Sequence, residues 1–461
     1  MIWAWTAGRI LTAENHYQHP SFTGCWRPEC PRRPAGHPAA MDVLSRPLID
    51  RTLPLLAEGY AWLPNRMRDT PGPVVRTRIL GRPALALRGP EAVRFFYDEG
   101  NVHRHRAIPE PVLATLFGHG AVHTLDGAAH RARKSLFLPL LEPGRIAGLV
   151  EHTTAAWEDA VPEWSRRGSV VLFDEASRVL CAGVHRWAGI PLDDSGSGSD
   201  AGATARDMIA MVDGFATAGP RHLRARRARA RQEERLGRLV CDVRTGTVTA
   251  PADSVLELVC RHRDAGGEPL DEKTAAVELL NVVRPTTAVA WFVAFTAHAL
   301  HTWPEHRAPL AEGDPPFTAA FAHEVRRFYP FVPFLGGLAA RDLYWRGEWI
   351  PAGGLVVLDV YGQNHDESLW GDPYAFRPRR FLERPVQRDE LIPQGGGDPA
   401  TGHRCPGEGV TVGVLEALAV RLARMEYTVP EQNLAIPLHR VPTRPQSGVL
   451  LSGVRPPAVS P

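Results

Sequence analysis

The sequence predicts a mainly α fold, with one large helical domain that carries small β-sheets. The chain has 461 residues, of which 44% are hydrophobic, so it can bury a large core. Apolar residues recur at helical spacing over most of its length, and the alternation typical of strands is confined to short segments. The sequence shows no internal repeat and no linker that divides the core.

Residues 1–40 are rich in Pro, Trp, His and Arg and show no periodicity. They are either a disordered leader or the result of a start assigned too early, so the folded domain is expected over 41–461. The segment 74–87, VVRTRILGRPALAL, alternates and turns at Gly81, which is typical of a β-hairpin. The next helix is expected to open at Pro90 and close at Gly100, the usual placing of proline and glycine.

The middle of the chain is expected to be helical. Helices are predicted over 126–140, 142–165, 171–188, 204–217 and 222–244, then from Asp271 to Trp303 and from Pro316 to Tyr329. Residues 193–203, DDSGSGSDAGA, are expected to form a flexible connection. A β-rich segment over 334–360, a stretch rich in glycine and proline, a helix after Cys405 and a strand-like tail complete the chain.

The composition excludes several classes of protein. The net charge is near neutral, +2, so nothing indicates a nucleic-acid partner. The 6 cysteines are too few and too scattered for a disulfide framework. No uninterrupted run of about 18 apolar residues predicts a membrane anchor, and the N-terminus is too polar for a signal peptide. We therefore expect a soluble cytoplasmic protein.

The stretch with the most specific chemistry is 393–422, PQGGGDPATGHRCPGEGVTVGVLEALAVRL. Cys405 follows a glycine-rich loop and precedes a helix, where backbone N–H groups can keep a thiolate ionised. Gly407 and Gly409 lack side chains, so a flat cofactor can approach closely. Upstream, HEVRR places Glu324 and Arg327 on one helix face, and YAFRPRRF (374–381) adds further arginines.

In this order the ExxR pair, the Pro-x-Arg-Phe segment and the cysteine loop resemble the cytochrome P450 superfamily. The resemblance implies the P450 fold, a haem b cofactor and Cys405 as the axial ligand of its iron. It implies a structural triad of Glu324, Arg327 and Arg380. His130, with Arg133 or Lys134, and His403 are expected to bind the haem propionates. The sequence departs from the general pattern at Gln394 (usually phenylalanine), at the inserted DPAT and at Arg379 (usually glutamate).

The segment 281–291, NVVRPTTAVAW, places two costly residues inside an apolar helix. Arginine is rarely buried without a partner, and a proline in a helix interior costs about 3 kcal/mol. P450 monooxygenases usually carry an acid and a threonine where Arg284 and Pro285 stand. The replacement resembles the bacterial fatty-acid peroxygenases and fatty-acid decarboxylases. It implies that Arg284 binds the carboxylate of a fatty acid and that Pro285 widens the helix beside it.

His123 and Phe117, in TLFGHGAVHTLDG (115–127), match positions of the alkene-forming members of that family. His123 is expected over the haem with Phe117 against it, whereas His119 is expected at the surface. The alkyl channel is predicted to include Leu116, Phe117, Val289, Phe331, Val332 and Phe334, of which the helical members are equally compatible with plain core.

The resemblance implies that the protein oxidises long-chain fatty acids with hydrogen peroxide and needs no redox partner. Decarboxylation to terminal alkenes is expected beside α/β-hydroxylation. Two enzymatic alternatives stay open: an enzyme that mainly hydroxylates fatty acids, and a reductase-dependent P450 monooxygenase. A haem-binding sensor or gas carrier is the alternative without catalysis.

Overall fold

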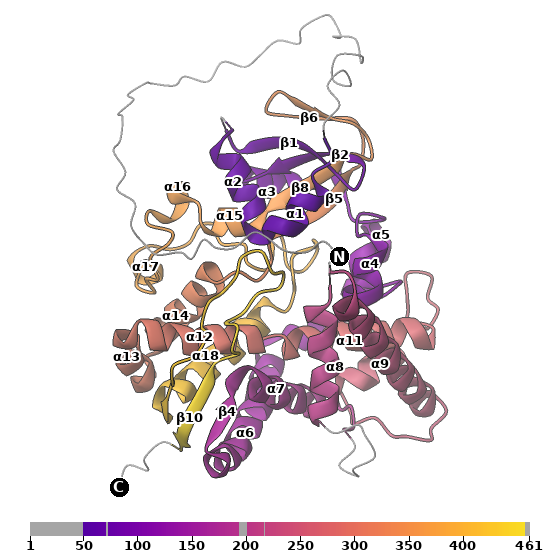
Figure 1. The fold of residues 1–461 in the computed structure, drawn as a ribbon. Coiled ribbons are helices and arrows are strands. Elements are labelled where there is room, and N and C mark those ends of the chain that lie inside the picture. Colours follow the sequence, from indigo (N-terminus) through magenta and orange to yellow (C-terminus); the bar gives the residue numbers. More distant parts are fainter. Residues whose placement is uncertain (1–48, 71, 193–200, 216, 457–461) are drawn as a thin grey trace, which may run out of the picture. The chain divides into compact units, whose positions relative to one another are not determined.

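A mixed sheet and a larger helical part make up the computed structural model, which describes residues 49–70, 72–192, 201–215 and 217–456 (Figure 1). The predictions for 1–40, for the domain start at 41 and for most of the connection 193–203 lie outside the described residues. Within them, the mainly α fold with small sheets is confirmed.

The predicted hairpin is confirmed as β1 (Val74–Ile79) and β2 (Arg82–Leu87). Its two-residue turn, Leu80 and Gly81, has φ values of 50° and 73°, the positive pair that a type I′ turn requires. The sheet continues in the order β1-β2-β8-β5-β3, with β2 and β8 parallel and the other pairs antiparallel. The added strands are β8 (Leu355–Asp359), β5 (Phe334–Ala339) and β3 (Val102–His103).

Both faces of this sheet are covered, which explains why its central strands are continuously apolar. Leu85 and Leu87 of β2 pack in one cluster with α3 (Pro90–Tyr97), whereas Ala84 and Ala86 pack in another with α2 (Trp62–Arg68). A first helix, α1 (Thr52–Glu58), precedes α2. Two smaller sheets pair β4 (Ser169–Val171), β10 (Leu450–Arg455) and β9 (Glu426–Thr428), and β6 (Leu343–Trp345) with β7 (Glu348–Ile350).

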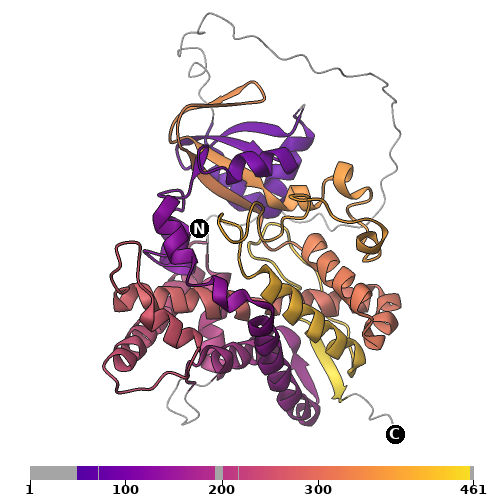
Figure 2. The same ribbon diagram turned by 180° about the vertical axis from the view of Figure 1, so that it is seen from behind.

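The helical part holds the main hydrophobic core. In Figure 2 the gold α18 (Glu408–Arg424) lies beside the purple α6 (Pro143–Arg167), and the two helices are in contact. The remaining helices of the described residues are α4 (Glu110–Val112), α5 (Gly127–Lys134), α7 (Leu172–Ala188), α8 (Ala201–Asp213), α9 (Pro220–Arg244), α10 (Val255–Arg261), α11 (Glu272–Thr287), α12 (Ala290–Thr302), α13 (Arg307–Glu312), α14 (Pro315–Phe328), α15 (Val360–Asn364), α16 (Glu367–Trp370) and α17 (Arg380–Glu383).

Most predicted helices are confirmed to within a few residues, and three boundaries differ. The helix expected over 126–140 ends at Lys134 and is followed by a 3₁₀ turn over Leu138–Leu141. The helix expected to close at Gly100 ends at Tyr97, and the one expected over 204–217 spans Ala201–Asp213.

The single helix expected from Asp271 to Trp303 is wrong, because it is broken into α11 and α12 at Ala288 and Val289. Pro285 has no N–H to donate to the carbonyl of Asn281. The backbone then tightens: the N–H of Val289 bonds to the carbonyl of Thr286 at 3.1 Å, three residues back. By length and composition Glu272–Thr302 passes for a membrane span, but 83% of its apolar window is buried inside the fold, as in a core helix.

Candidate functional site

Cys405 lies in the loop that leads into α18, surrounded by groups that act on its sulfur. Its N–H donates to the carbonyl of Gln394 at 3.2 Å, and the Gln394 Nε2 lies 3.7 Å from Sγ. Burial raises the pKa of the Cys405 thiol, whereas the N–H of Gly407, the Gln394 amide and the Lys134 charge lower it. A Cβ on Gly407 would lie 3.9 Å from Sγ. The half-buried sulfur is therefore supplied with donors and suited to a cation that stabilises the thiolate.

Gln394 is oriented by a buried arginine. Arg326 Nε donates to Gln394 Oε1 at 3.2 Å, and because arginine has only donors, the amide nitrogen must face the other way. That nitrogen donates to Thr411 Oγ1 at 3.0 Å and faces the cysteine sulfur. Arg326 also pairs with Glu408, which binds Arg404 at 2.6 Å. The departure from phenylalanine thus connects Cys405 to an ion-pair network.

The structure brings the predicted triad together. Arg327 Nε lies 2.7 Å and Arg380 Nε 3.3 Å from Glu324 Oε2, and the side chains of Glu324 and Arg327 are 0% exposed. Arg327 Nη1 donates to the carbonyls of Asn364 and Pro373, at 2.9 and 2.8 Å. The triad therefore holds the segment that runs toward the cysteine loop.

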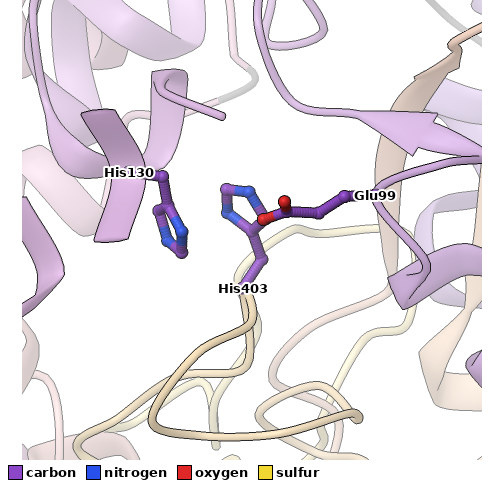
Figure 3. Close-up of side chains that lie close together, drawn as sticks. All are labelled: Glu99, His130 and His403. Atoms are coloured by element: carbon purple, nitrogen blue, oxygen red, sulfur yellow. The ribbon is translucent and has the colours of Figure 1, made fainter. Parts of the chain in front are cut away.

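His130 and His403 stack on each other, with ring centroids 3.9 Å apart, and the Glu99 carboxylate points toward them (Figure 3). Asp126 lies 3.4 Å from His403 Nε2 and accepts backbone N–H bonds from Arg104 and His105, both at 2.8 Å. Burial lowers the pKa of His130 to about 3, and its Nδ1 has no partner among the described residues. The pair offers neutral imidazoles whose unmet bonds suit an acidic group.

Arg133 and Lys134, two of the three Arg/Lys residues of α5, are engaged with protein groups. Arg133 Nη1 donates to Glu278 Oε1 at 2.9 Å and to the carbonyl of Gly120 at 3.1 Å. Lys134 Nζ donates to the carbonyls of Gly402 and Arg404. Lys134 thus joins α5 to the cysteine loop, and a direct role of either residue toward propionates stays a prediction.

Arg284, on α11, is 4% exposed, and its Nη1 has no hydrogen-bond partner within the described part of the chain. Burial, with the charge of Arg229 acting in the same direction and Glu278 opposing it, lowers the pKa of the guanidinium to about 9. Its Cζ lies 5.9 Å from the centre of the Phe117 ring. An uncompensated buried cation is costly, so the site favours an anion.

His123, in the 3₁₀ turn Val122–Thr124, lies beside Phe117 with ring centroids 4.5 Å apart. Burial, and then the charge of Arg284, lower the pKa of His123 to about 3. His403, His130 and Lys134 also act on this pKa, so His123 and the residues around the cysteine loop belong to one region. His119 has a side chain 57% exposed, as predicted.

The predicted channel residues do not form one cluster. Val289 is buried in the helical core, and Leu116 and Phe331 pack against that core. Val332 packs with the sheet and α3, and Phe334 packs on the face covered by α2. Val289 is thus a member of the helical core, and its place in the alkyl channel stays a prediction.

The residues fit an iron porphyrin. A half-buried sulfur with N–H donors and no side chain at Gly407 suits the iron. His130 Nδ1, which has no partner among the described residues, suits a propionate. Arg284 Nη1 and His123 Nδ1 are two further buried nitrogens without a partner in that part of the chain. Sequence reasoning missed Arg326, Glu408, Glu278 and Arg229. Arg326 stands beside Arg327 but outside the ExxR spacing from Glu324, so no motif of the segment marked it.

Comparison with known proteins agrees with this site. The cytochrome P450 family model matches residues 314–422. Among curated proteins, cytochrome P450 1A1 of Rattus norvegicus is 36% identical over 145 residues, 30% of this chain and 26% of that protein. The putative cytochrome P450 137 of Mycobacterium tuberculosis is 28% identical over 200 residues, 41% of either chain. The matches span about a quarter to two fifths of the length of these two relatives.

Solved structures match over nearly their whole length. Cytochrome P450SP alpha (CYP152B1), in complex with (R)-ibuprophen, is 39% identical over 88% of this chain and 99% of its own, with a TM-score of 0.85. Cytochrome P450EX alpha (CYP152N1) with myristic acid is 36% identical over 88% and 98%, with a TM-score of 0.83. A variant of cytochrome P450 OleT with arachidonic acid is 36% identical over 90% and 99%, with a TM-score of 0.86. The chain therefore belongs to the cytochrome P450 superfamily and, within it, to the family of fatty-acid peroxygenases and decarboxylases that its motifs resemble.

Proposed function

We propose that this protein is a haem-thiolate peroxygenase that uses hydrogen peroxide to oxidise long-chain fatty acids. Its products are terminal alkenes, by oxidative decarboxylation, and α- and β-hydroxy acids. The observation that carries the proposal is Arg284, a buried guanidinium whose Nη1 finds no partner among the residues that the structure describes, beside Phe117 and near His123. Two relatives were solved with a long-chain acid, myristic acid and arachidonic acid, which supports this substrate class.

The cofactor is proposed to be haem b. Cys405 would hold its iron, and His130 with His403 would bind its propionates. When bound, the haem would supply an iron whose bond to the Cys405 thiolate favours cleavage of the O–O bond.

Arg284 would bind the fatty-acid carboxylate through two parallel N–H bonds, which fixes the orientation of the acid. Peroxide cleavage requires a group that takes a proton from one oxygen and returns it to the other. The carboxylate held by Arg284 can do this, so no acid–alcohol pair is needed on the helix. His123, whose pKa of about 3 keeps it neutral, can donate from one ring nitrogen and accept at the other, so it can pass a proton on without holding a charge.

The overall decarboxylation balances without a redox partner. A saturated fatty acid and one hydrogen peroxide give a terminal alkene, carbon dioxide and two waters. The peroxide accepts the two electrons that leave the substrate, and the C–C bond to the carboxyl carbon breaks as the alkene forms.

The test is an incubation of the haem-loaded protein with myristic acid and hydrogen peroxide, with products identified by gas chromatography. We expect alkene and hydroxy acids without any reductase. Product that requires NADPH, a ferredoxin and its reductase would assign the protein to the monooxygenases. A protein that binds haem and oxidises the acid under neither condition would be the sensor or carrier.

Arg284→Ala tests the carboxylate anchor in the same assay. Hydrogen bonds to a charged group contribute about 1.5–3 kcal/mol, so the Kd for myristic acid should rise roughly ten- to hundredfold. We expect turnover to be lost while the ferrous–carbon monoxide spectrum stays unchanged. Arg261→Ala is the control, because Arg261 is 77% exposed and pairs only along its own helix with Glu257. Full activity of Arg284→Ala would contradict the anchor.

A further inference from the structure

The segment that carries Phe117 and His123 has little secondary structure of its own. A single π-helical turn spans Leu113–Phe117, and a 3₁₀ turn spans Val122–Thr124. Between them lie Gly118 and Gly120, both with positive φ. Such a segment is held in place by its contacts with the rest of the fold.

We propose that Glu278 and Arg229, with Arg133, are positioning residues that hold Phe117 and His123 against Arg284 and thereby set the product ratio. This inference rests on the proposed function, because it names the residues that hold Phe117 and His123 in the positions that the proposed function requires. None of these three residues is proposed to contact the substrate directly.

Arg229, on α9, fixes the first end of the segment. Its side chain is 3% exposed, and it donates from Nη1 to the carbonyl of Leu116 at 2.9 Å and from Nη2 to that of Phe117 at 3.0 Å. Its Nε binds Glu233 at 2.7 Å, so all three donor positions are in use. A Cβ on Gly118 would lie 2.0 Å from Nη2, so the segment approaches the guanidinium as only glycine allows.

Glu278, on α11, fixes the second end. It is 0% exposed, and Oε1 accepts the N–H of Val122, the residue before His123, at 2.9 Å. The same oxygen accepts Arg133 Nη1, which also donates to the carbonyl of Gly120. Oε2 accepts the amide of Asn281 at 3.0 Å. One carboxylate therefore positions the backbone on both sides of Ala121.

The helix that carries Glu278 also carries Arg284. One helix, α11, therefore positions both Val122, through Glu278, and Arg284, the proposed carboxylate anchor. Phe117 completes the set, since its ring contacts His123 at 4.5 Å and lies 5.9 Å from the Arg284 Cζ. A shift of this segment would move His123 relative to the substrate carboxyl group.

Stability alone is a poor explanation of these charges. A buried ion pair contributes little net stability, because the cost of desolvation offsets the attraction, and apolar residues of similar size often do as well. The charged groups instead form directional hydrogen bonds, each of which fixes the position of one backbone N–H or carbonyl of the segment. Direction matters most beside a reacting group, where small displacements reduce rates strongly.

The test uses the haem-loaded full chain and two independent changes. The double variant Glu278→Leu with Arg133→Met removes both buried charges, so neither is left unpaired. Arg229→Lys keeps the charge but replaces three donor nitrogens in a fixed planar fork by one, so Glu233 and the two carbonyls can no longer each be bound by a nitrogen of their own. The control is Glu272→Gln, an exposed glutamate in the first turn of the same helix, 4.0 Å from Arg244.

The first readout is amide hydrogen exchange of residues 113–124, which requires no turnover. We expect exchange of the Val122 amide to become roughly tenfold faster or more in the double variant, and that of the segment to rise in Arg229→Lys. The second readout is the ratio of alkene to hydroxy acid among the products, which we expect to fall in both variants. Glu272→Gln should leave both readouts unchanged.

Unchanged exchange in both variants would overturn the proposal, since the segment would then be held by other contacts. Faster exchange with an unchanged product ratio would also overturn it, because the contacts would be structural only. Failure of the unmodified protein to turn over with peroxide would refute the proposed function, and the exchange experiment would still decide whether these residues hold the segment.

Discussion

At the scale of single residues, burial sets the charge of His123 and Arg284 in opposite ways. The imidazole can become neutral, and its pKa of about 3 keeps it so throughout the physiological range. The guanidinium keeps its charge there, with its pKa lowered only to about 9, so it needs an anion in the pocket. One residue thus supplies proton-transfer chemistry, and the other supplies attraction for a carboxylate.

His123→Gln should lower the fraction of alkene and raise that of hydroxy acid. Glutamine keeps a donor and an acceptor, but its amide nitrogen cannot take a proton, whereas a neutral imidazole can accept a proton at one ring nitrogen while it donates from the other. Because the pKa of His123 lies near 3, the product ratio of the unmodified protein should not change between about pH 5 and 8. Gas chromatography of the products across that range checks both statements.

His119→Gln is the matched control, since this exposed histidine lies four residues away in the chain and faces Glu110 at 4.0 Å. Its product ratio should equal that of the unmodified protein. An unchanged ratio in His123→Gln would remove His123 from the catalytic residues.

At the scale of elements, the break between α11 and α12 is the feature that a local pattern did not predict. Apolar residues recur at helical spacing on both sides of Pro285, from Asp271 to Trp303. Such a pattern indicates which residues are buried, but it does not show where a backbone hydrogen bond is missing. Proline marked the place, but the break appears three residues later, at Ala288 and Val289. The helices that were predicted well, α6, α9 and α14, carry proline in the first turn, a local signal.

Pro285→Ala should stabilise the protein and slow it. Restoring the N–H at this position removes a cost of about 3 kcal/mol, which should raise the Tm by roughly 3 °C in a domain of this size. Because the variant restores a regular helix where α11 now ends beside Arg284, kcat with peroxide should fall while the ferrous–carbon monoxide spectrum is kept. Thermal unfolding and initial rates on the same preparation measure both effects.

Pro162→Ala supplies the comparison, because Pro162 lies inside α6 and is exposed. It should raise the Tm in the same direction and leave kcat unchanged. A higher Tm with full kcat in Pro285→Ala would leave Pro285 with a structural role only.

At the scale of the whole molecule, the site divides into parts with and without a local signal. Cys405, Glu324 and Arg327 stand in short motifs, so the sequence alone indicated them. Arg229 binds carbonyls 113 and 112 positions away, and Glu278 binds an N–H 156 positions away. In a chain rich in arginine, partners so distant leave no pattern that distinguishes them from solvated charges.

Packing of the whole core also holds histidines neutral outside the haem pocket. His185, on α7, is 0% exposed, and its Nδ1 donates to the carbonyl of Cys181 at 2.8 Å. Its Nε2 faces Arg235 Nη2 at 3.4 Å, so this nitrogen accepts and cannot carry a second proton beside that cation. Burial, with Arg235 acting in the same direction, lowers the pKa of His185 to about 3.

This histidine should make the protein less stable as the pH falls. The unfolded chain binds a proton at His185 below a pKa of about 6.5, whereas the folded protein does not until near pH 3. The unfolded state therefore binds more protons between these values, so the free energy of unfolding rises with pH there and is lost on acidification. At pH 5 the loss from this one group is about 2 kcal/mol, since one unit of pKa corresponds to about 1.4 kcal/mol.

His185→Asn should reduce that loss, because the asparagine amide can still donate to the Cys181 carbonyl but does not titrate. Urea unfolding of the haem-loaded protein at pH 7 and pH 5 gives the two free energies. The difference between them should be smaller by about 2 kcal/mol in the variant, even where its stability at pH 7 is lower. His152→Asn, at an exposed position of α6, should keep the full difference. An equal loss in His185→Asn and the unmodified protein would show that acid acts through other groups.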